Sequence, residues 1–280
     1  MKIGQISKQG KVMAAIFEGN VAKPIQNYTV IDLLEKAERE SAELTEIAIS
    51  LAQNEFVAAK PIIPIEPGEV WACGCAYQVS AEWRDAEHGV REGLYAAVYK
   101  NQRPELFFKG NARVCTGPGD YIGIRSDSSF TAPEAELAVV MGSNGKVFGY
   151  TIGNDVSAWD IERENPLYLP QSKIFDGCSA LGPVIVTTDE LKDPYNLEIS
   201  CTIERNGQII FDGKSTTKKL ARKIDEMIGF LLRSNKIPSG SVLMTGTGVI
   251  IPAEAALKPE DKVTIRIPEI GELSNVARMV

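Results

Sequence analysis

The chain has 280 residues, of which 44% are hydrophobic and 24% are charged, proportions that exclude a disordered or collagen-like chain and favour a globular protein. No apolar stretch reaches the roughly 18–20 residues of a membrane-spanning helix, and residues 1–12 lack the apolar core of a secretory signal. The net charge of −7, without a Lys/Arg-rich run, argues against nucleic acid, so we expect neither a membrane nor a nucleic acid partner.

The first part of the chain has the pattern of a small α+β unit. Two short strands are predicted over residues 2–6 and 12–17, joined near Gly10. The apolar residues that follow recur with the helical period, which predicts one helix over residues 28–54. Thr29 is its predicted N-cap, because a threonine side chain can accept hydrogen bonds from the first free N–H groups of a helix.

A proline-rich segment separates this unit from the rest. Three prolines within residues 60–68 predict an extended linker, so we expect a small N-terminal domain over residues 1–65 and a larger one over residues 66–280. Helices are predicted over residues 80–100 and 218–233. Strands are predicted over residues 137–141, 146–151, 184–186, 197–203, 208–211, 242–244 and 263–267. We therefore expect an α+β fold whose larger domain is mostly strand.

Cysteine and histidine usage narrows the chemistry. The five cysteines are an odd number and are typical of free thiols in a reducing cytoplasm, so we expect a cytoplasmic protein. Cys73 and Cys75 are predicted to lie on a buried strand that leads toward the active site, not in a metal site. The single histidine, His88, excludes a histidine-bound zinc cluster, and we expect it in a surface loop.

Three carboxylates are predicted to meet on one hairpin. Glu134 and Glu136 are two residues apart on a strand, so they share a face. The Asn144-Gly145 pair predicts a two-residue turn, which pairs residues whose numbers add up to 289 and places Asp155 opposite Glu134. Directly opposed Cβ atoms lie about 4.5–5.5 Å apart. Carboxylates this close repel unless one is protonated or a cation lies between them.

This acidic cluster predicts a site for a hard divalent ion. Carboxylate oxygens without imidazole or thiolate suit Mg²⁺, with Mn²⁺ or Ca²⁺ also possible. The alternative is a solvated strand end that carries acidic side chains. A bulge near residues 142–143 would also move the pairing by one residue and separate the acids.

Two further features are candidate site elements. Lys173 lies between a proline-containing loop and apolar residues, where it could bind a substrate carboxylate or act as a base, or could be an ordinary surface lysine. The run Thr245-Gly246-Thr247-Gly248 could present backbone N–H groups to an anion, although most such runs are only turns.

Several longer segments resemble the fumarylacetoacetate hydrolase superfamily. They occur in the same order over most of residues 66–280, and within the superfamily they are most similar to the 2-keto-3-deoxy-D-arabinonate dehydratases. These segments are RPELFFK (103–109), PEAELAVV (133–140), GYTIGNDVSA (149–158) and ENPLYLPQSK (164–173).

The resemblance implies a β-rich roll in the larger domain beside a small N-terminal domain. It implies one Mg²⁺ held by Glu134, Glu136 and Asp155, in agreement with the hairpin argument. It implies that Lys173 and Glu105 face the substrate as catalytic residues, and that the chain assembles as a homodimer or homotetramer. The candidate substrate-binding residues are Thr247, Gly246 and Lys109.

The sequence departs from the superfamily pattern at two places. Hydrolases of the superfamily commonly carry a histidine three residues after a tyrosine, where this chain has Ser80 after Tyr77, which argues against hydrolysis of a carbon–carbon bond. Trp159 and Ala81 stand where arginines are usual. These two missing positive charges leave the substrate open.

The leading interpretation is a magnesium-dependent dehydratase, a hydro-lyase, that converts a 2-keto-3-deoxy sugar acid into 2,5-dioxopentanoate. The metal would stabilise an enolate, and Glu105 and Lys173 would carry the two proton transfers in an order that stays open. One alternative is an acylpyruvate hydrolase or oxaloacetate-type decarboxylase of the same superfamily. The other is a non-catalytic member that binds a sugar acid or a metal.

Overall fold

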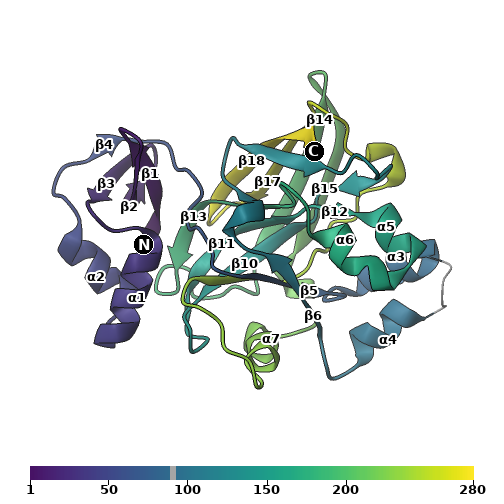
Figure 1. Ribbon diagram of the computed structural model, residues 1–280, viewed down its shortest axis with the longest axis horizontal. Coiled ribbons are helices and arrows are strands. Elements are labelled where there is room, and N and C mark those ends of the chain that lie inside the picture. The colour runs from purple at the N-terminus through teal and green to yellow at the C-terminus, as the bar shows by residue number, and fades with distance from the viewer. Residues whose placement is uncertain (89–92) are drawn as a thin grey trace.

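The computed structural model describes residues 1–88 and 93–280, apart from the side chains of residues 87 and 88. Figure 1 shows a small lobe that holds the N-terminus beside a larger lobe that holds most of the strands. The small lobe contains β1 (Lys2–Lys8), β2 (Lys11–Glu18), β3 (Val21–Ile25), α1 (Val30–Glu40), α2 (Leu44–Leu51) and β4 (Val57–Ala58).

The predicted helix over residues 28–54 is two helices. Thr29 caps α1 as predicted: its side chain accepts from the N–H of Asp32, whose carboxylate accepts from the Thr29 N–H at 2.6 Å. The C-cap Ser41 is left-handed, with φ of 50°, which ends α1. The single helix was wrong because Ala37 and Leu44 are seven residues apart, about two helical turns, so the apolar period continues across the break.

One sheet of eleven strands runs through both lobes. Its order is β4-β3-β2-β1-β13-β11-β10-β16-β5-β6, with β7 added beside β13. Ile3 of β1 pairs with Ile185 of β13, so the small lobe continues the sheet of the larger one. The domain boundary at residue 65 stays a prediction. The other strands are β5 (Val70–Gly74), β6 (Glu105–Gly110), β7 (Cys115–Thr116), β10 (Ala135–Met141), β11 (Val147–Asp155), β13 (Ser179–Thr187) and β16 (Ser241–Met244).

Strand β10 lies in the middle of this sheet, and all of its residues are buried. Leu137 and Val139 belong to one hydrophobic core, whereas Ala138 and Val140 belong to a second core on the other face. This arrangement explains why the strand is apolar throughout, as a strand covered on both sides must be. The second core also contains side chains of α1, which fix the small lobe against the sheet.

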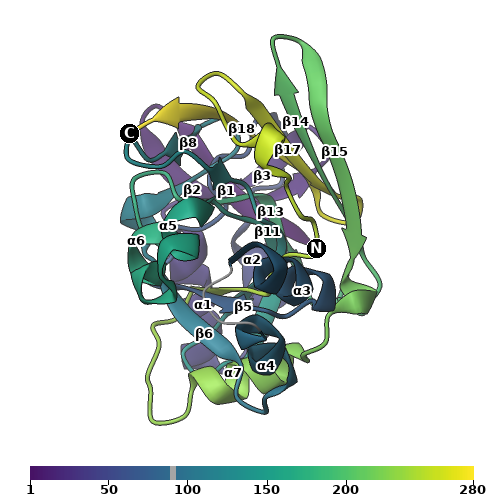
Figure 2. The same cartoon turned by 90° about the vertical axis from the view of Figure 1, so that its right-hand side faces the viewer.

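A second sheet of five strands has the order β15-β14-β17-β18-β8. Asn206 and Gly207 form the two-residue turn between β14 and β15 with φ of 52° and 77°, which joins the strands predicted over residues 197–203 and 208–211. Figure 2 shows this hairpin extending beyond the rest of the larger lobe. The strands are β8 (Tyr121–Ile124), β14 (Glu198–Arg205), β15 (Gln208–Thr216), β17 (Lys262–Ile267) and β18 (Gly271–Met279).

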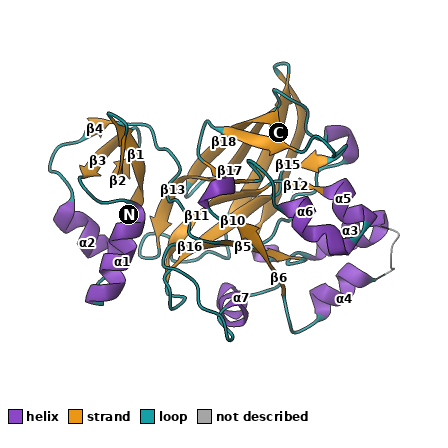
Figure 3. Ribbon diagram, in the orientation of Figure 1, coloured by secondary structure: helices purple, strands orange, loops and turns teal. Residues whose placement is uncertain are grey.

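The remaining helices are α3 (Gln78–His88), α4 (Leu94–Lys100), α5 (Trp159–Glu164), α6 (Leu169–Lys173) and α7 (Ile224–Leu231). Helices α3, α4, α5 and α6 lie on the side of the larger lobe away from the N-terminus, apart from α7 (Figure 3). The helix predicted over residues 218–233 begins only at Ile224, because its N-cap Lys223 has an extended backbone. None of the described helices is long and apolar enough to cross a membrane. The described residues also form four single 3-10 turns. Two short strands, β9 (Thr131–Ala132) and β12 (Ser157–Ala158), pair with each other outside the two large sheets.

Candidate metal centre and active site

The β10–β11 hairpin brings three carboxylates together, as its predicted register requires. Glu136 pairs with Gly153, which gives the expected sum of 289, and the Asp155 N–H donates to the Glu134 carbonyl at 3.0 Å. One ligand oxygen from each of Glu134, Glu136 and Asp155 lies within 4.8 Å of the others, and all three side chains are buried. The acids therefore form one cluster at the end of the hairpin, inside the protein.

The turn that sets this register is not the simple one predicted. The Gly145 N–H donates to the Gly142 carbonyl and the Gly142 N–H to the Lys146 carbonyl, so three residues form the loop. A bulge between Val140 and Met141 then moves the pairing by one residue. The three-residue loop and the bulge cancel, which is why the two-residue assumption still places Asp155 beside Glu134.

Two buried lysines hold the cluster from α6 and β6. Lys173 Nζ lies 2.7 Å from Glu134 Oε1, 3.0 Å from Asp155 Oδ2 and 2.7 Å from the Ser157 hydroxyl. Lys109 Nζ lies 2.6 Å from Asp155 Oδ1 and also donates to the Val156 and Lys173 carbonyls. An ammonium has three N–H donors, so both lysines have a protein acceptor for each.

The glycine-threonine loop after β16 contacts the cluster through its backbone. The Gly246 N–H donates to Glu136 Oε2 at 2.6 Å. Gly246 has φ of 93°, and a Cβ there would lie 2.9 Å from the Cys73 carbonyl, so only glycine fits. The Thr247 hydroxyl donates to the Val249 carbonyl and accepts from the Val249 N–H, so it stabilises the turn.

The neighbours of the three acids set their pKa values apart. Burial alone would raise the pKa of Glu134, but Lys173 and Arg84 outweigh burial and lower it to about 2. Burial, together with the charges of Asp155 and Glu134, raises the pKa of Glu136 well above its usual range. Burial alone would lower the pKa of Lys173, but Asp155 and Glu134 outweigh it and raise this pKa. The cluster therefore has one firmly ionised acid and one acid that resists ionisation.

The sequence reasoning missed Arg84, which reaches the cluster from α3. Its Nη2 lies 3.3 Å from Glu134 Oε1, and its Nη1 lies 3.1 Å from Glu162 Oε1 on α5. The Trp159 indole N–H donates to Glu134 Oε1 at 2.6 Å. Arg84 therefore brings a guanidinium to the centre although Trp159 and Ala81 stand where arginines are usual. Both of these residues are buried. One signal was available, since Arg84 is the only lysine or arginine among residues 71–90.

Glu105 lies beside this region at the start of β6. Burial raises its pKa and the charge of Glu162 adds to this, whereas Arg84, Lys173 and a hydrogen bond with Cys75 oppose it. Cys75 follows β5 and is buried, so the Cys-x-Cys segment does lead from a buried strand into the site. A Cβ on Gly74 would lie 2.2 Å from Glu105 Oε2, so the glycine makes room for the carboxylate.

The histidine that hydrolases of the superfamily commonly carry is not at its expected position. Ser80, at the position where the hydrolases carry histidine, is buried. His88 is the last residue of α3, so its backbone is helical where a loop was predicted, and its side chain lies outside the described structure. The described centre thus contains carboxylates, amines and a guanidinium.

The donor set fits a hard divalent ion. If all five carboxylates of this region were ionised, they would exceed its three cations by two negative charges. Burying an uncompensated charge is costly, and a divalent cation would neutralise this excess. Three carboxylate oxygens within reach of one another are the ligands that Mg²⁺ prefers. The carboxylates are Glu105, Glu134, Glu136, Asp155 and Glu162, and the cations are Arg84, Lys109 and Lys173.

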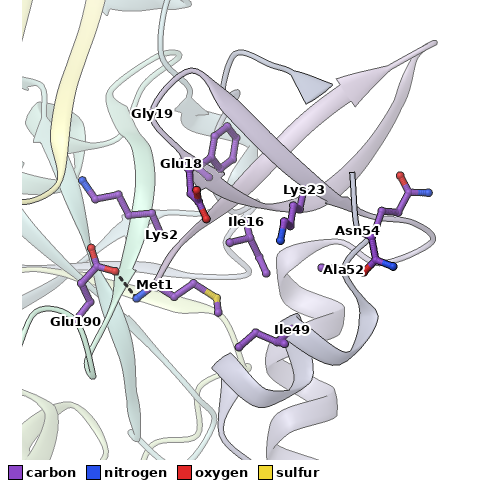
Figure 4. A pocket seen from close by; sticks show the side chains of 12 residues that line it. Met1, Lys2, Ile16, Glu18, Gly19, Lys23, Ile49, Ala52, Asn54 and Glu190 are labelled. Atoms are coloured by element: carbon purple, nitrogen blue, oxygen red, sulfur yellow. Dashed lines mark ion pairs between the residues drawn. The ribbon is translucent and has the colours of Figure 1, made fainter. Parts of the chain in front are cut away.

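Cavities lie around the centre but do not coincide with it. One of about 400 Å³ is lined by residues that include Tyr77, which is buried and interacts electrostatically with Glu136. A larger one of about 630 Å³ lies at the small lobe, where the Met1 amine forms an ion pair with Glu190 (Figure 4). None of the residues that line this larger cavity belongs to the carboxylate cluster. The 400 Å³ cavity therefore has one lining residue, Tyr77, that interacts with the carboxylate cluster.

Comparison with known proteins gives consistent results. A model of the fumarylacetoacetate (FAA) hydrolase C-terminal family matches residues 69–278. The chain is 51% identical over 213 residues to a 2-dehydro-3-deoxy-D-arabinonate dehydratase of Saccharolobus solfataricus, covering 75% of this chain and 72% of that protein. It is 42% identical over 238 residues to a probable 2-keto-3-deoxyxylonate dehydratase of Haloferax volcanii, covering 85% and 81%.

A solved structure is similar over the whole length. It is a 2-keto-3-deoxy-D-arabinonate dehydratase complexed with magnesium and 2,5-dioxopentanoate, with a TM-score of 0.84 and 40% sequence identity. The alignment covers 100% of this chain and 99% of that one. The small lobe, the roll and the helices around the centre are therefore all part of one shared fold.

Proposed function

The chain belongs to the fumarylacetoacetate hydrolase family, and on that premise we propose that it is a magnesium-dependent dehydratase of a 2-keto-3-deoxy sugar acid. The substrate is of the 2-keto-3-deoxy-arabinonate type, and the products are 2,5-dioxopentanoate and water. The observation that carries this proposal is the combination of a buried Glu-Glu-Asp cluster with 51% identity to a dehydratase. The enzyme is a metal-dependent lyase.

Glu134, Glu136 and Asp155 are the proposed metal ligands. They would hold a divalent ion, which would supply positive charge for the enolate oxygen and would compete with Lys173 for the carboxylates that keep its amine protonated. The protein fixes the ligands in advance: the Gly246 N–H orients Glu136, and the Lys109 ammonium orients Asp155. These two residues were predicted to bind substrate, and their contacts support a role in positioning the ligands.

Lys173 and Glu105 are the proposed proton-transfer groups. Dehydration removes a proton from C3 and the hydroxyl from C4, and the unsaturated product rearranges to the C5 aldehyde. Glu105 suits the general acid that protonates the leaving hydroxyl, because burial raises its pKa and keeps its proton. Lys173 is the candidate acceptor of the C3 proton, because an ion bound by Glu134 and Asp155 would weaken the contacts of 2.7 Å and 3.0 Å that keep its amine protonated.

The chain's surroundings and assembly are also proposals. All five cysteines are free in the structure, which supports a cytoplasmic location. Assembly as a homodimer or homotetramer is expected from the family resemblance, and light scattering of the purified protein would determine it. The predicted contact of Thr247 with a substrate carboxylate stays a prediction, because its hydroxyl bonds to its own turn.

A product assay tests the proposed function. Purified protein is incubated with 2-keto-3-deoxy-arabinonate and Mg²⁺, and 2,5-dioxopentanoate is followed through a coupled aldehyde dehydrogenase. We expect turnover by the wild type and by Glu164→Gln, an exposed change on α5, and at least a hundredfold loss in Glu105→Ala, since a general acid contributes about 10²–10⁴ in rate. Turnover of an acylpyruvate in place of the sugar acid would overturn the proposal.

A further inference from the structure

A buried polar cluster lies next to the carboxylate centre, and the proposed mechanism does not use it. Arg84 on α3 and Glu162 on α5 form an ion pair of 3.1 Å, and the Tyr95 hydroxyl donates to the same Glu162 oxygen at 3.3 Å. Arg84 is 4% exposed and Glu162 is 2% exposed. The second terminal nitrogen of Arg84 lies 3.3 Å from Glu134 Oε1, so Arg84 connects this cluster directly to a proposed metal ligand.

Two carboxylate oxygens in this region have no partner among the described residues. They are Glu162 Oε2 and Glu105 Oε2, and both are inaccessible to solvent. Native proteins pair nearly all buried polar atoms, because an unpaired one loses its hydration without compensation. Arg84, Glu162 and Glu105 also interact electrostatically with one another, so the two oxygens belong to one neighbourhood. This neighbourhood therefore has free acceptors beside a guanidinium.

Such a combination matches a hydroxyl group. A hydroxyl donates one hydrogen bond, which a carboxylate oxygen accepts, and accepts another, which a guanidinium N–H donates. Charge-assisted bonds of this kind are shorter and stronger than neutral ones. The proposed substrate would present its carboxylate and keto oxygens to the cation and its C4 hydroxyl to the general acid, with its C5 hydroxyl next along the carbon chain. The C5 hydroxyl is the group for which no partner has yet been named.

We propose that Arg84 and Glu162 form a subsite for the C5 hydroxyl of the sugar acid, an inference that rests on the proposed function. Glu162 Oε2 accepts the hydroxyl proton, and the Arg84 guanidinium donates to the hydroxyl oxygen. Glu134 keeps its indole bond from Trp159 at 2.6 Å when Arg84 turns toward the substrate. The subsite rejects acids without the hydroxyl, because their binding leaves its charged groups unpaired.

The subsite is tested by binding of two acids that cannot lose water. 5-Hydroxy-2-oxopentanoate and 2-oxopentanoate both lack the C4 hydroxyl and differ only in the C5 hydroxyl. Their dissociation constants are measured by calorimetry in Mg²⁺, with wild type, Glu162→Gln, Arg84→Lys and the control Glu164→Gln. We expect wild type and control to bind the hydroxy acid about 10- to 100-fold more tightly, as a hydrogen bond to a charged group provides.

Both subsite variants should lose this preference, and Glu162→Gln, which changes no proposed metal ligand, should keep its affinity for 2-oxopentanoate. A preference that persists in both variants, or that is missing from the wild type, overturns the subsite. Equal loss of affinity for both acids also overturns it, because the residues then act only through the metal centre. Failure of the proposed function is separate: a retained preference without turnover of 2-keto-3-deoxy-arabinonate refutes the reaction and leaves the subsite standing.

Discussion

Replacing Glu136 by glutamine should stabilise the protein without metal and abolish its response to metal. The ligand oxygens of Glu134, Glu136 and Asp155 lie within 4.8 Å of one another. Two unit charges 4.8 Å apart repel by about 3.5 kcal/mol at an effective dielectric constant of about 20. Lys173 offsets part of this repulsion, and the pKa of Glu136 is raised by burial and by both neighbours. Glutamine is neutral, has the same shape, and can still accept from the Gly246 N–H.

We expect Glu136→Gln to gain about 1–3 kcal/mol in EDTA, which for a chain of this size is about 2–6 °C in melting temperature. The assay is thermal unfolding of EDTA-treated protein with and without Mg²⁺. Wild type should gain about 2.7 kcal/mol at a Mg²⁺ concentration one hundred times its dissociation constant, and the variant should gain nothing. A variant that melts below wild type in EDTA, or that keeps the Mg²⁺ shift, would refute this reasoning.

Three further predictions concern the residues around the ligands. Lys109→Met should lose about 3–5 kcal/mol in urea unfolding, because Asp155 Oδ1 is left buried without its ammonium donor while only Oδ2 keeps Lys173; a loss below 1 kcal/mol would contradict this. Gly74→Ala should lower kcat about 10²-fold or more, because a Cβ 2.2 Å from Glu105 Oε2 displaces the acid; unchanged kcat would count against Glu105. The wild-type rate should fall as pH rises through the raised pKa of Glu105, since a general acid works only while protonated, and this fall should be missing from the residual rate of Glu105→Gln.

The carboxylate cluster could be predicted because it depends on local pairing. Once β10 and β11 form a hairpin, the register places Asp155 beside Glu134, and the unforeseen loop and bulge compensate each other. The capping of α1 by Thr29 and the tight turn at Asn206-Gly207 were predictable for the same reason, because the residues that interact are neighbours in the sequence.

The surroundings of the cluster were not predictable, because they come from distant segments. Arg84 meets Glu134 across 50 residues and Glu162 across 78. No periodicity or turn in the sequence relates α3 to α5. The tryptophan at position 159, where an arginine is usual, therefore suggested a missing positive charge, whereas the fold brings the charge of Arg84 to the cluster from α3. Lys109 was similarly expected to bind substrate, whereas its burial at 0% exposure and its three protein acceptors became visible only in the folded chain.

The central claim is that the three carboxylates bind the metal that makes dehydration possible. The most direct measurement is the formation of 2,5-dioxopentanoate by EDTA-treated protein during titration with Mg²⁺. We predict no product in EDTA and a saturable rise that fits one site per chain, which Glu136→Gln abolishes although it remains folded. Product formation that is equally fast in EDTA, or that persists in Glu136→Gln, would contradict the account.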